Sequence, residues 1–229
     1  MTLQTVILAA GMGSRLGRSL PKPLTELSDG RSIMQQQHDN IRVAFGSAAR
    51  ITTVVGYRAE TIVEAFPDVH YVYNHRYDQT NTSKSLLRAL ATTGRSGVLW
   101  MNGDVVFDPR VLGRAMPLIE REQSFVTVNT SKVSDEEVKY TVTAEGWIDQ
   151  LSKTVKGGIG EAVGINYISS ADKRAFMRGL QRVDDQDYFE RGLELAIADG
   201  VRLQPLDISD LYAVEVDFAE DLERANLFV

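Results

Sequence analysis

Short runs of apolar residues alternate along the chain with longer segments whose apolar side chains recur every three or four positions. In the first half, the short runs are rich in β-branched and aromatic residues and predict strands over residues 5–10, 50–56, 70–74 and 97–103. The intervening segments predict helices over residues 32–45, 59–66 and 82–92. Such alternation is typical of right-handed β-α-β units, in which helices cover both faces of a parallel sheet.

The second half has a different pattern. Apolar runs predict strands joined by turns over residues 124–131, 138–153 and 162–169, and helices over residues 171–181 and 188–199. Two further short strands and a helix over residues 218–226 follow. Because no linker or repeat interrupts the chain, we expect one α/β domain over residues 1–229, with a mixed, mostly parallel sheet flanked by helices. Ligands of such sheets bind beyond the carboxyl ends of the strands.

Composition narrows the class of protein. The 229 residues can bury a substantial core, and no segment is apolar over the length that a membrane span needs. The chain begins without a basic segment and cleavage site, so we expect a cytoplasmic protein with no membrane partner. The absence of cysteine excludes disulfides, thiolate nucleophiles and cysteine-ligated metals. Any metal is therefore expected on oxygen or imidazole ligands, although the histidines show no ligand spacing.

The charge balance argues against a nucleic-acid partner. The net charge is −6, from 25 basic and 31 acidic residues, whereas binding along a phosphate backbone needs a basic stripe. A small phosphorylated ligand needs only a local cluster of positive charge. Arg15, Arg18 and Lys22 supply such a cluster.

A glycine-rich loop follows the first predicted strand, in "LAAGMGSRLGRSLPKPL". Glycines let backbone N–H groups approach and surround a phosphate. The dinucleotide-binding fingerprint does not fit, because Gly11, Gly13 and Gly17 have the wrong spacing and Tyr57 and Arg58 stand where its acidic residue belongs. The Walker Gly-Lys-Ser/Thr pattern is absent. An ordinary glycine turn with basic surface residues is the remaining structural alternative.

The loop and its downstream Pro-Lys-Pro resemble the signature of the nucleotidyltransferases of the GT-A-like fold. These enzymes join a nucleoside triphosphate to a phosphorylated sugar or alcohol and release pyrophosphate. The resemblance implies that Arg15 clamps the β- and γ-phosphates, and that Lys22 bridges the α-phosphate and the attacking phosphate. Cations are needed there because the two reactants are both anions and repel one another. No general base is needed, since the attacking oxygen is already ionised.

The same resemblance implies a nucleotide site and a metal site. The main chain around Leu8, Ala9, Ala10, Gly11 and Gly13 is expected to bind the nucleotide, with residues 1–110 as the nucleotide-binding half. Asp104 in "WMNGDVVFD" and Asp217 in "YAVEVDFAEDL" match the aspartates that hold Mg²⁺ in the family. An aspartate after a strand can also simply cap a helix or turn.

One segment indicates a branch of the family. "YNHRYDQTNTSKSL" resembles the branch that activates phosphocholine and related phospho-alcohols or phosphonates with CTP. In that branch the positions of Asn81 and Ser85 lie near the pyrimidine, and Tyr57 in "VVGY" is a further nucleotide-binding candidate. Asn81 also suits a helix N-terminus, and both roles are compatible.

The acceptor is expected in residues 111–229. In "DQLSKTVKGGIGEAVGINYIS", the resemblance places Lys153 at the acceptor phosphate and Glu161 near the acceptor. "DDQDYFERGLELAI" resembles the segment that presents a carboxylate and aromatic side chains to a cationic head group. Glu190 with Tyr188 or Phe189, and also Trp147, could hold an ammonium by charge and cation–π attraction. Alternatively, Phe189 belongs to the buried stripe of a helix whose Glu190 lies in water.

These patterns lead to the expectation of a Mg²⁺-dependent cytidylyltransferase acting on a phosphocholine-like or 2-aminoethylphosphonate-like acceptor. The alternatives are a sugar-1-phosphate nucleotidyltransferase using UTP, dTTP or GTP, and a catalytically inactive nucleotide-binding regulatory protein. A GT-A glycosyltransferase fits less well, because "MNGDVVFD" lacks the usual Asp-x-Asp. A homodimer is compatible with the sequence, although no apolar stripe stands out as an interface.

Overall fold

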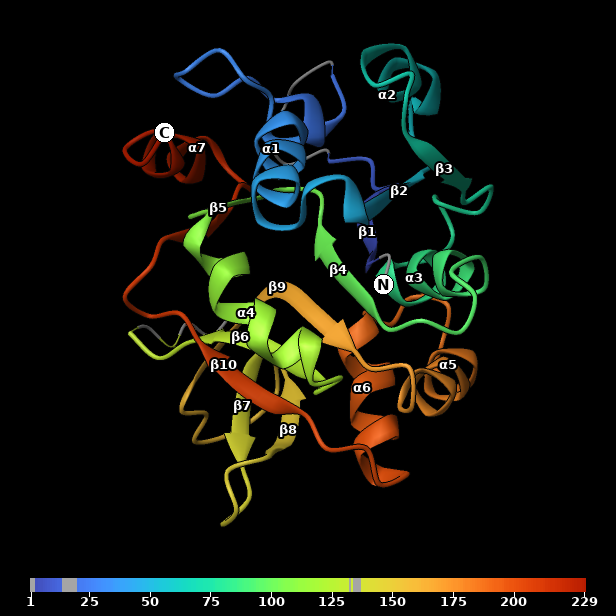
Figure 1. Ribbon diagram of the computed structural model, residues 1–229, viewed down its shortest axis with the longest axis vertical. Coiled ribbons are helices and arrows are strands. Elements are labelled where there is room, and N and C mark those ends of the chain that lie inside the picture. Colours follow the sequence, from blue (N-terminus) through green and yellow to red (C-terminus); the bar gives the residue numbers. More distant parts are fainter. Residues whose placement is uncertain (1–2, 14–19, 132, 134–136) are drawn as a thin grey trace.

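The computed structural model describes residues 3–13, 20–131, 133 and 137–229. A central sheet contains strands from both halves of the chain, in the order β10-β6-β9-β4-β1-β2-β3 (Figure 1). Strands β1, β2, β3 and β4 run parallel, whereas β9 runs antiparallel to both β4 and β6. The bounds are β1 Leu3–Ala9, β2 Ala49–Val55, β3 His70–Tyr73, β4 Val98–Asn102, β6 Phe125–Asn129, β9 Gly160–Ile168 and β10 Gln204–Asp207. The predicted mixed, mostly parallel α/β sheet is therefore confirmed.

Two smaller strand pairings extend the sheet region. Strands β7 (Lys139–Val142) and β8 (Ile148–Ser152) form a hairpin, and β7 continues onto β9. Strand β5 (Val105–Phe107) follows β4 almost directly and pairs antiparallel with β11 (Ala213–Glu215). This second pairing joins the segment after β4 to the last strand of the chain.

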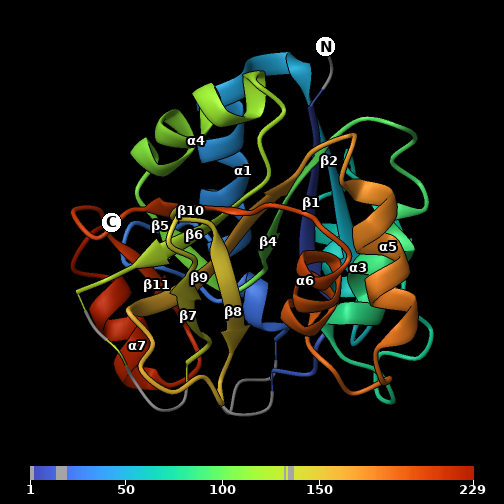
Figure 2. The ribbon, with the colours of Figure 1, turned by 90° about the horizontal axis from the view of Figure 1, so that it is seen from below.

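Helices cover both faces of the sheet (Figure 2). Helices α1 and α4 lie on one face, and α3, α5 and α6 on the other. The helices are α1 Ile33–Phe45, α2 Ala59–Ala65, α3 Thr82–Leu90, α4 Arg110–Glu120, α5 Lys173–Arg182, α6 Phe189–Ala198 and α7 Ala219–Ala225, with short 3-10 turns at Lys22–Leu24 and Gly46–Ala48. Within the described part of the chain, every helix is too short or too polar to cross a membrane.

The apolar runs of the central strands are buried on both sides. In β1, Val6 and Leu8 pack into the core beneath α3, α5 and α6, whereas Ile7 packs into the core beneath α1 and α4. Because a strand with helices on both faces has no solvent side, its sequence is continuously apolar and does not alternate. The "TVILAA" run at residues 5–10 therefore predicted a central strand correctly.

Helix α4 is an element that the sequence patterns did not predict. Gly113 and Pro117 both lie inside it, and each weakens the helical signal. Proline has no N–H to donate to the carbonyl of the residue four positions earlier, which is Gly113. The helix forms nonetheless because burial of its apolar face, which includes Val111, Leu112 and Leu118, outweighs the poor local propensity.

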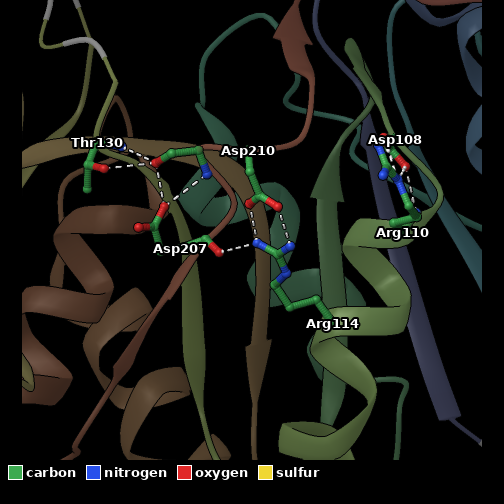
Figure 3. A network of polar contacts seen from close by, with 7 residues as sticks. Asp108, Arg110, Arg114, Thr130, Asp207 and Asp210 are labelled. Atoms are coloured by element: carbon green, nitrogen blue, oxygen red, sulfur yellow. Dashed lines mark hydrogen bonds and ion pairs between the residues drawn. The ribbon is translucent and has the colours of Figure 1, made fainter.

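A polar network fixes α4 to the connection between β10 and β11 (Figure 3). The Arg114 guanidinium donates to the two carboxylate oxygens of Asp210 at 2.5 and 2.7 Å and to the Asp207 carbonyl at 2.9 Å. Hydrogen bonding to Arg114 lowers the pKa of Asp210 to about 2. In the same view Arg110 pairs with Asp108. The network holds the segment that leads through β11 to Asp217.

Candidate active site

A cavity of about 300 Å³ opens at the carboxyl ends of β1 and β4. Leu8 of β1 lies opposite Asn102 of β4, and the Gly103 N–H donates to the Leu8 carbonyl at 2.9 Å. The cavity is lined by Leu8, Ala9, Gly11, Gly13, Lys22, Pro23, Thr82, Asn102, Gly103, Asp104, Lys153, Tyr188, Phe189, Glu190, Glu215 and Asp217. It therefore lies where a parallel sheet binds its ligands, and it is lined by both halves of the chain.

One ammonium and two carboxylates form the charged centre of this cavity. Lys22 Nζ lies 2.8 Å from Asp104 Oδ2 and 2.5 Å from Asp217 Oδ1. Lys22 begins the 3-10 turn Lys22–Leu24, whose start is set by Pro21, and Asp104 follows β4. Asp217 reaches the same place because β11 pairs with β5, and the Val216 N–H donates to the Asp104 carbonyl at 3.0 Å.

The electrostatics of this centre keep Lys22 charged. Burial on its own lowers the pKa of Lys22, but attraction and hydrogen bonding from Asp104 and Asp217 outweigh it, so the pKa is raised above its ordinary value. The lysine side chain is 10% exposed, against 25% and 34% for the two aspartates. A cation held between two carboxylates shows that this position favours positive charge.

The two aspartates suit a divalent cation bound together with phosphate. Their oxygens already converge on one cation, and Asp104 Oδ1 is buried without a hydrogen-bond partner among the described residues. Carboxylate oxygens are the ligands that Mg²⁺ prefers, and Mg²⁺ usually takes only one or two of them, with water and phosphate oxygens completing the octahedron. Over residues 3–13, 20–131, 133 and 137–229, three or more acidic or histidine side chains do not gather into a metal-binding group. The donor set thus fits a metal shared with a nucleotide.

The sequence reasoning missed Glu215 and Asn102 in this cavity. Glu215 Oε1 accepts a hydrogen bond from Asn102 Nδ2 at 2.8 Å. Burial, followed by the nearby Asp104 carboxylate, raises the pKa of Glu215 above its ordinary value, although the bond from Asn102 opposes this. Both residues lie within two positions of a predicted metal ligand in the sequence. That proximity was the signal that could have identified them.

A further acidic side chain, that of Glu190, also lines this cavity. Glu190 is only 9% exposed, and its Oε2 has no hydrogen-bond partner among the residues that the structure describes. Burial raises the pKa of Glu190 to about 7, against the lowering effects of its own backbone N–H and of Lys153. Glu190 is therefore not in water, so that part of the alternative is wrong, whereas Phe189 does belong to the buried stripe of the helix. Phe189 beside it is also buried, and its ring meets Trp100 edge-on at 5.6 Å.

Lys153 and Tyr188 are neighbours in this cavity. Lys153 Nζ is 5.4 Å from the centre of the Tyr188 ring, within range of a cation–π contact. Both side chains line the cavity, and Tyr188 is 44% exposed. An anion that binds Lys153 would thus also contact an aromatic face.

The other acceptor candidates lie elsewhere. Glu161 lines a neighbouring cavity of about 530 Å³, which shares Glu215 and Asp217 with the first. Trp147 lines neither cavity. The Arg202 guanidinium carbon lies over the Trp147 ring, 5.9 Å from its centre. An acceptor that extended from the first cavity into the second would therefore reach Glu161. Trp147 lies instead in the region of the β7–β8 hairpin.

Among the nucleotide-binding candidates, Ala9 and Gly11 line the first cavity, whereas Tyr57, Asn81 and Ser85 do not. The Tyr57 N–H donates to the Ala10 carbonyl at 3.1 Å, which joins β2 to the glycine loop. Asn81 begins α3 as its N-cap, and Ser85 is buried and accepts a bond from Asn74 at 3.0 Å. The predicted helix N-terminus at Asn81 is confirmed. Arg15 lies outside the described residues.

The sequence matches a known protein family and two named relatives. Residues 5–163 match the family described as MobA-like NTP transferase domain. The chain is 28% identical to CMP-5'-(3-aminopropyl)phosphonate synthase from Streptomyces rubellomurinus, in an alignment covering 98% of this chain and 38% of that protein. It is also 28% identical to the bifunctional protein GlmU from Stutzerimonas stutzeri, over 96% of this chain and 50% of that protein. The chain therefore spans half or less of the length of these relatives.

Solved structures share the fold at low identity. The inositol-1-phosphate CTP transferase from T. maritima superposes with a TM-score of 0.76 and 15% identity, covering 100% of this chain and 98% of that one. The CTP:phosphocholine cytidylyltransferase from Streptococcus pneumoniae superposes with a TM-score of 0.76 and 15% identity, covering 99% of each chain. The family match includes more than half of the chain, with the glycine loop, Lys22 and Asp104 inside it. The chain therefore belongs to the MobA-like NTP transferase family of nucleotidyltransferases.

Proposed function

We propose that this chain transfers a cytidylyl group from CTP to a small acceptor that carries a phosphate or phosphonate at one end and an ammonium at the other. Pyrophosphate is the second product. The observation that carries the proposal is the buried side chain of Glu190, whose Oε2 has no hydrogen-bond partner among the described residues, in the same cavity as Lys22, Asp104 and Asp217. Ionising a buried carboxyl group is costly unless the charge is paired, and a substrate cation beside Glu190 would offset that cost.

The proposed reaction is an in-line displacement at the α-phosphorus of CTP. An acceptor phosphate or phosphonate oxygen forms the new P–O bond, and the bond between the α-phosphorus and the bridging oxygen breaks as pyrophosphate leaves. Lys22 neutralises the charge that builds up between the two anions. The backbone of Gly11 and Gly13, which line the cavity, faces the phosphates. Arg15 remains the predicted ligand of the leaving pyrophosphate.

Asp104 and Asp217 would hold Mg²⁺ against the triphosphate. The ion would supply charge neutralisation and orientation of the phosphate oxygens when bound. Lys22, which bridges both aspartates in this structure, would then release them and turn to the phosphates. Its ammonium can do so because a lysine side chain is a flexible point charge without a fixed hydrogen-bonding plane.

The acceptor would lie across the middle of the cavity. Lys153 would bind its phosphate or phosphonate, Tyr188 would cover its apolar part, and Glu190 would pair with its ammonium. The neighbouring cavity lined by Glu161 gives a longer acceptor space to extend.

The names of similar proteins support CTP and an amine-bearing acceptor. One relative is a CMP-aminopropylphosphonate synthase, and one structural neighbour is a phosphocholine cytidylyltransferase. A putative glucose-1-phosphate thymidylyltransferase from Bacillus anthracis has a TM-score of 0.80 and 15% identity. The sugar-1-phosphate alternative is therefore included in the test.

The test is pyrophosphate release with Mg²⁺ across CTP, UTP, dTTP and GTP. The acceptors are phosphocholine, phosphoethanolamine, 2-aminoethylphosphonate, 3-aminopropylphosphonate, inositol phosphate and glucose 1-phosphate. We expect turnover with CTP and an amine-bearing acceptor, and a large loss in Glu190→Gln. Glu194→Gln is the matched control, because Glu194 lies on the same helix in an ion pair with Arg191 at 2.8 Å and outside the cavity. Turnover only with a neutral acceptor would contradict the role of Glu190 and favour the sugar-phosphate alternative, whereas triphosphate binding without turnover would favour a regulatory protein.

A further inference from the structure

Several hydrogen bonds join the N-terminus of α3 to the end of α5, to the α5–α6 connection and to the start of α6, although these elements come from different halves of the chain. The Asn81 N–H donates to the Asp185 carbonyl at 2.8 Å, and Asn81 Nδ2 donates to the Gln186 carbonyl at 3.2 Å. Lys84 Nζ donates to the Leu180 and Val183 carbonyls at 3.0 and 2.6 Å. Segment 81–84 thus holds the connection from α5 to α6, which leads to Tyr188 and Glu190.

Thr82 makes the contact nearest to the cavity. Its Oγ1 accepts a hydrogen bond from the Phe189 N–H at 3.2 Å, and Thr82 itself lines the cavity. Phe189 is the first residue of α6, and the residue before it, Tyr188, provides no side-chain cap. The first amide groups of a helix need acceptors, which a Ser, Thr, Asp or Asn at the N-cap normally supplies. In α6 the hydroxyl of Thr82, on another helix, supplies one of them.

This contact bears directly on Glu190. Glu190 follows Phe189 in the first turn of α6. Because the Glu190 side chain is buried, its position in the cavity depends mainly on where that turn lies. The Phe189 ring anchors the turn on its other side against Trp100. Two contacts therefore determine where the first turn of α6 lies relative to the cavity. One is the hydrogen bond to the Thr82 hydroxyl on α3, and the other is the packing of the Phe189 ring against Trp100 in the core.

We infer that Thr82 is a positioning residue for the acceptor: it caps α6 from α3 and thereby fixes Glu190 and Tyr188 against the rest of the site. The inference rests on the proposed function, since it assigns to Thr82 the placement of the groups that bind the acceptor. Thr82 acts through α6 and not on the nucleotide, so its loss should affect the two substrates differently.

The test compares Thr82→Val, which keeps the shape and removes the acceptor oxygen, with Thr82→Ser, which keeps the hydroxyl. Thr92→Val is the matched control, because Thr92 lies just beyond the C-terminal end of the same helix and its hydroxyl donates locally to the Ala89 carbonyl at 2.8 Å. We expect the acceptor KM to rise about tenfold in Thr82→Val, as for the loss of one buried hydrogen bond, with kcat and the CTP KM within about twofold. Thr82→Ser should stay close to wild type. An unchanged acceptor KM, or an equal rise in the CTP KM, would overturn the inference.

A substrate-free measurement separates this inference from the proposed function. If the wild-type protein releases no pyrophosphate with any amine-bearing acceptor, the proposed function fails, and hydrogen exchange of the Phe189 amide then decides the structural claim. Exchange about tenfold faster in Thr82→Val, and unaltered in Thr92→Val, would support the cap. Unaltered exchange in Thr82→Val would overturn it.

Discussion

Lys22 Nζ lies 2.8 Å from Asp104 Oδ2, although the two residues are 82 positions apart in the sequence. The contact joins the segment after β1 to the end of β4. The same ammonium reaches Asp217 at 2.5 Å. In this structure the ammonium proposed to act at the phosphates is therefore paired with the two residues that would hold the metal. Substrate and metal binding would exchange these partners: the metal would replace the ammonium at the two aspartates, and the ammonium would move to the phosphates.

The first prediction concerns Lys22. Lys22→Met should lower kcat about 100- to 1000-fold, because a point charge at the developing phosphate charge is lost. Apparent affinity for Mg²⁺ in the absence of nucleotide should increase, since the ammonium no longer competes for Asp104 and Asp217. Pyrophosphate release and Mg²⁺ titration by calorimetry measure the two effects, with circular dichroism as the control for folding. Wild-type turnover in the folded variant would refute the mechanism.

The second prediction concerns Asp104. Asp104→Asn keeps the size of the side chain and removes a charge that both Lys22 and a divalent cation would use. Turnover should fall at least about 100-fold, and raising Mg²⁺ should restore part of it if the loss lies in metal affinity. The matched control is Asp108→Asn, because Asp108 follows β5 nearby and pairs with Arg110 outside the cavity. Equal losses in both variants would indicate a structural effect.

The third prediction uses the titration of Glu190. Its pKa is raised to about 7, so kcat/KM for an amine-bearing acceptor should rise with pH through about 7 as the carboxylate ionises. The Glu190→Gln profile should lack this rise, and the difference between the two profiles removes the titration of the acceptor phosphate, which they share. Coincident profiles would contradict pairing between Glu190 and the substrate.

The fourth prediction is the stability counterpart of the third. The folded-state pKa of Glu190 lies above the ordinary value of 4.5, so the folded protein holds its proton more tightly, and the free energy of unfolding should decrease as pH rises from about 4.5 to about 7. Glu190→Gln should therefore be more stable than wild type at about pH 8, by up to about 3 kcal/mol, and nearly equal to it at about pH 5. Urea unfolding at both pH values tests this. A variant that is less stable at pH 8 would show that the buried charge has an unseen partner.

The fifth prediction contrasts two glycines. Gly164 has φ +73°, and a Cβ there would lie 2.8 Å from both Asn102 Nδ2 and Glu215 Oε1. Gly164→Ala should lower stability by about 1–3 kcal/mol and disturb the Asn102–Glu215 pair. Gly113 lies in α4 with open space around its Cβ position, so Gly113→Ala should raise stability by about 0.5–1 kcal/mol. Thermal unfolding of both variants provides the comparison, and the same sign of change in both would contradict it.

The sequence alone determined the elements whose signals are local. The continuous apolar run of β1 predicts a strand buried on both faces, and Asn81 predicts the start of α3, because burial periodicity and capping act within a few residues. The loop with its Pro-Lys-Pro indicated the family. Local signals failed at α4, where Gly113 and Pro117 oppose the helix and only packing of its apolar face stabilises it.

Only the tertiary structure decided which charges share a cavity. Asp217 meets Lys22 because β11 pairs with β5, and no local pattern encodes a strand pairing across about half of the chain. Likewise, periodicity left Glu190 either in water or facing the site, and the packing of α6 against α3 and the sheet buried it. The number of residues between two groups in the sequence does not show whether their charges lie side by side in the folded protein. The pKa of Glu190 and the link through Thr82 therefore emerge only when the two halves are assembled.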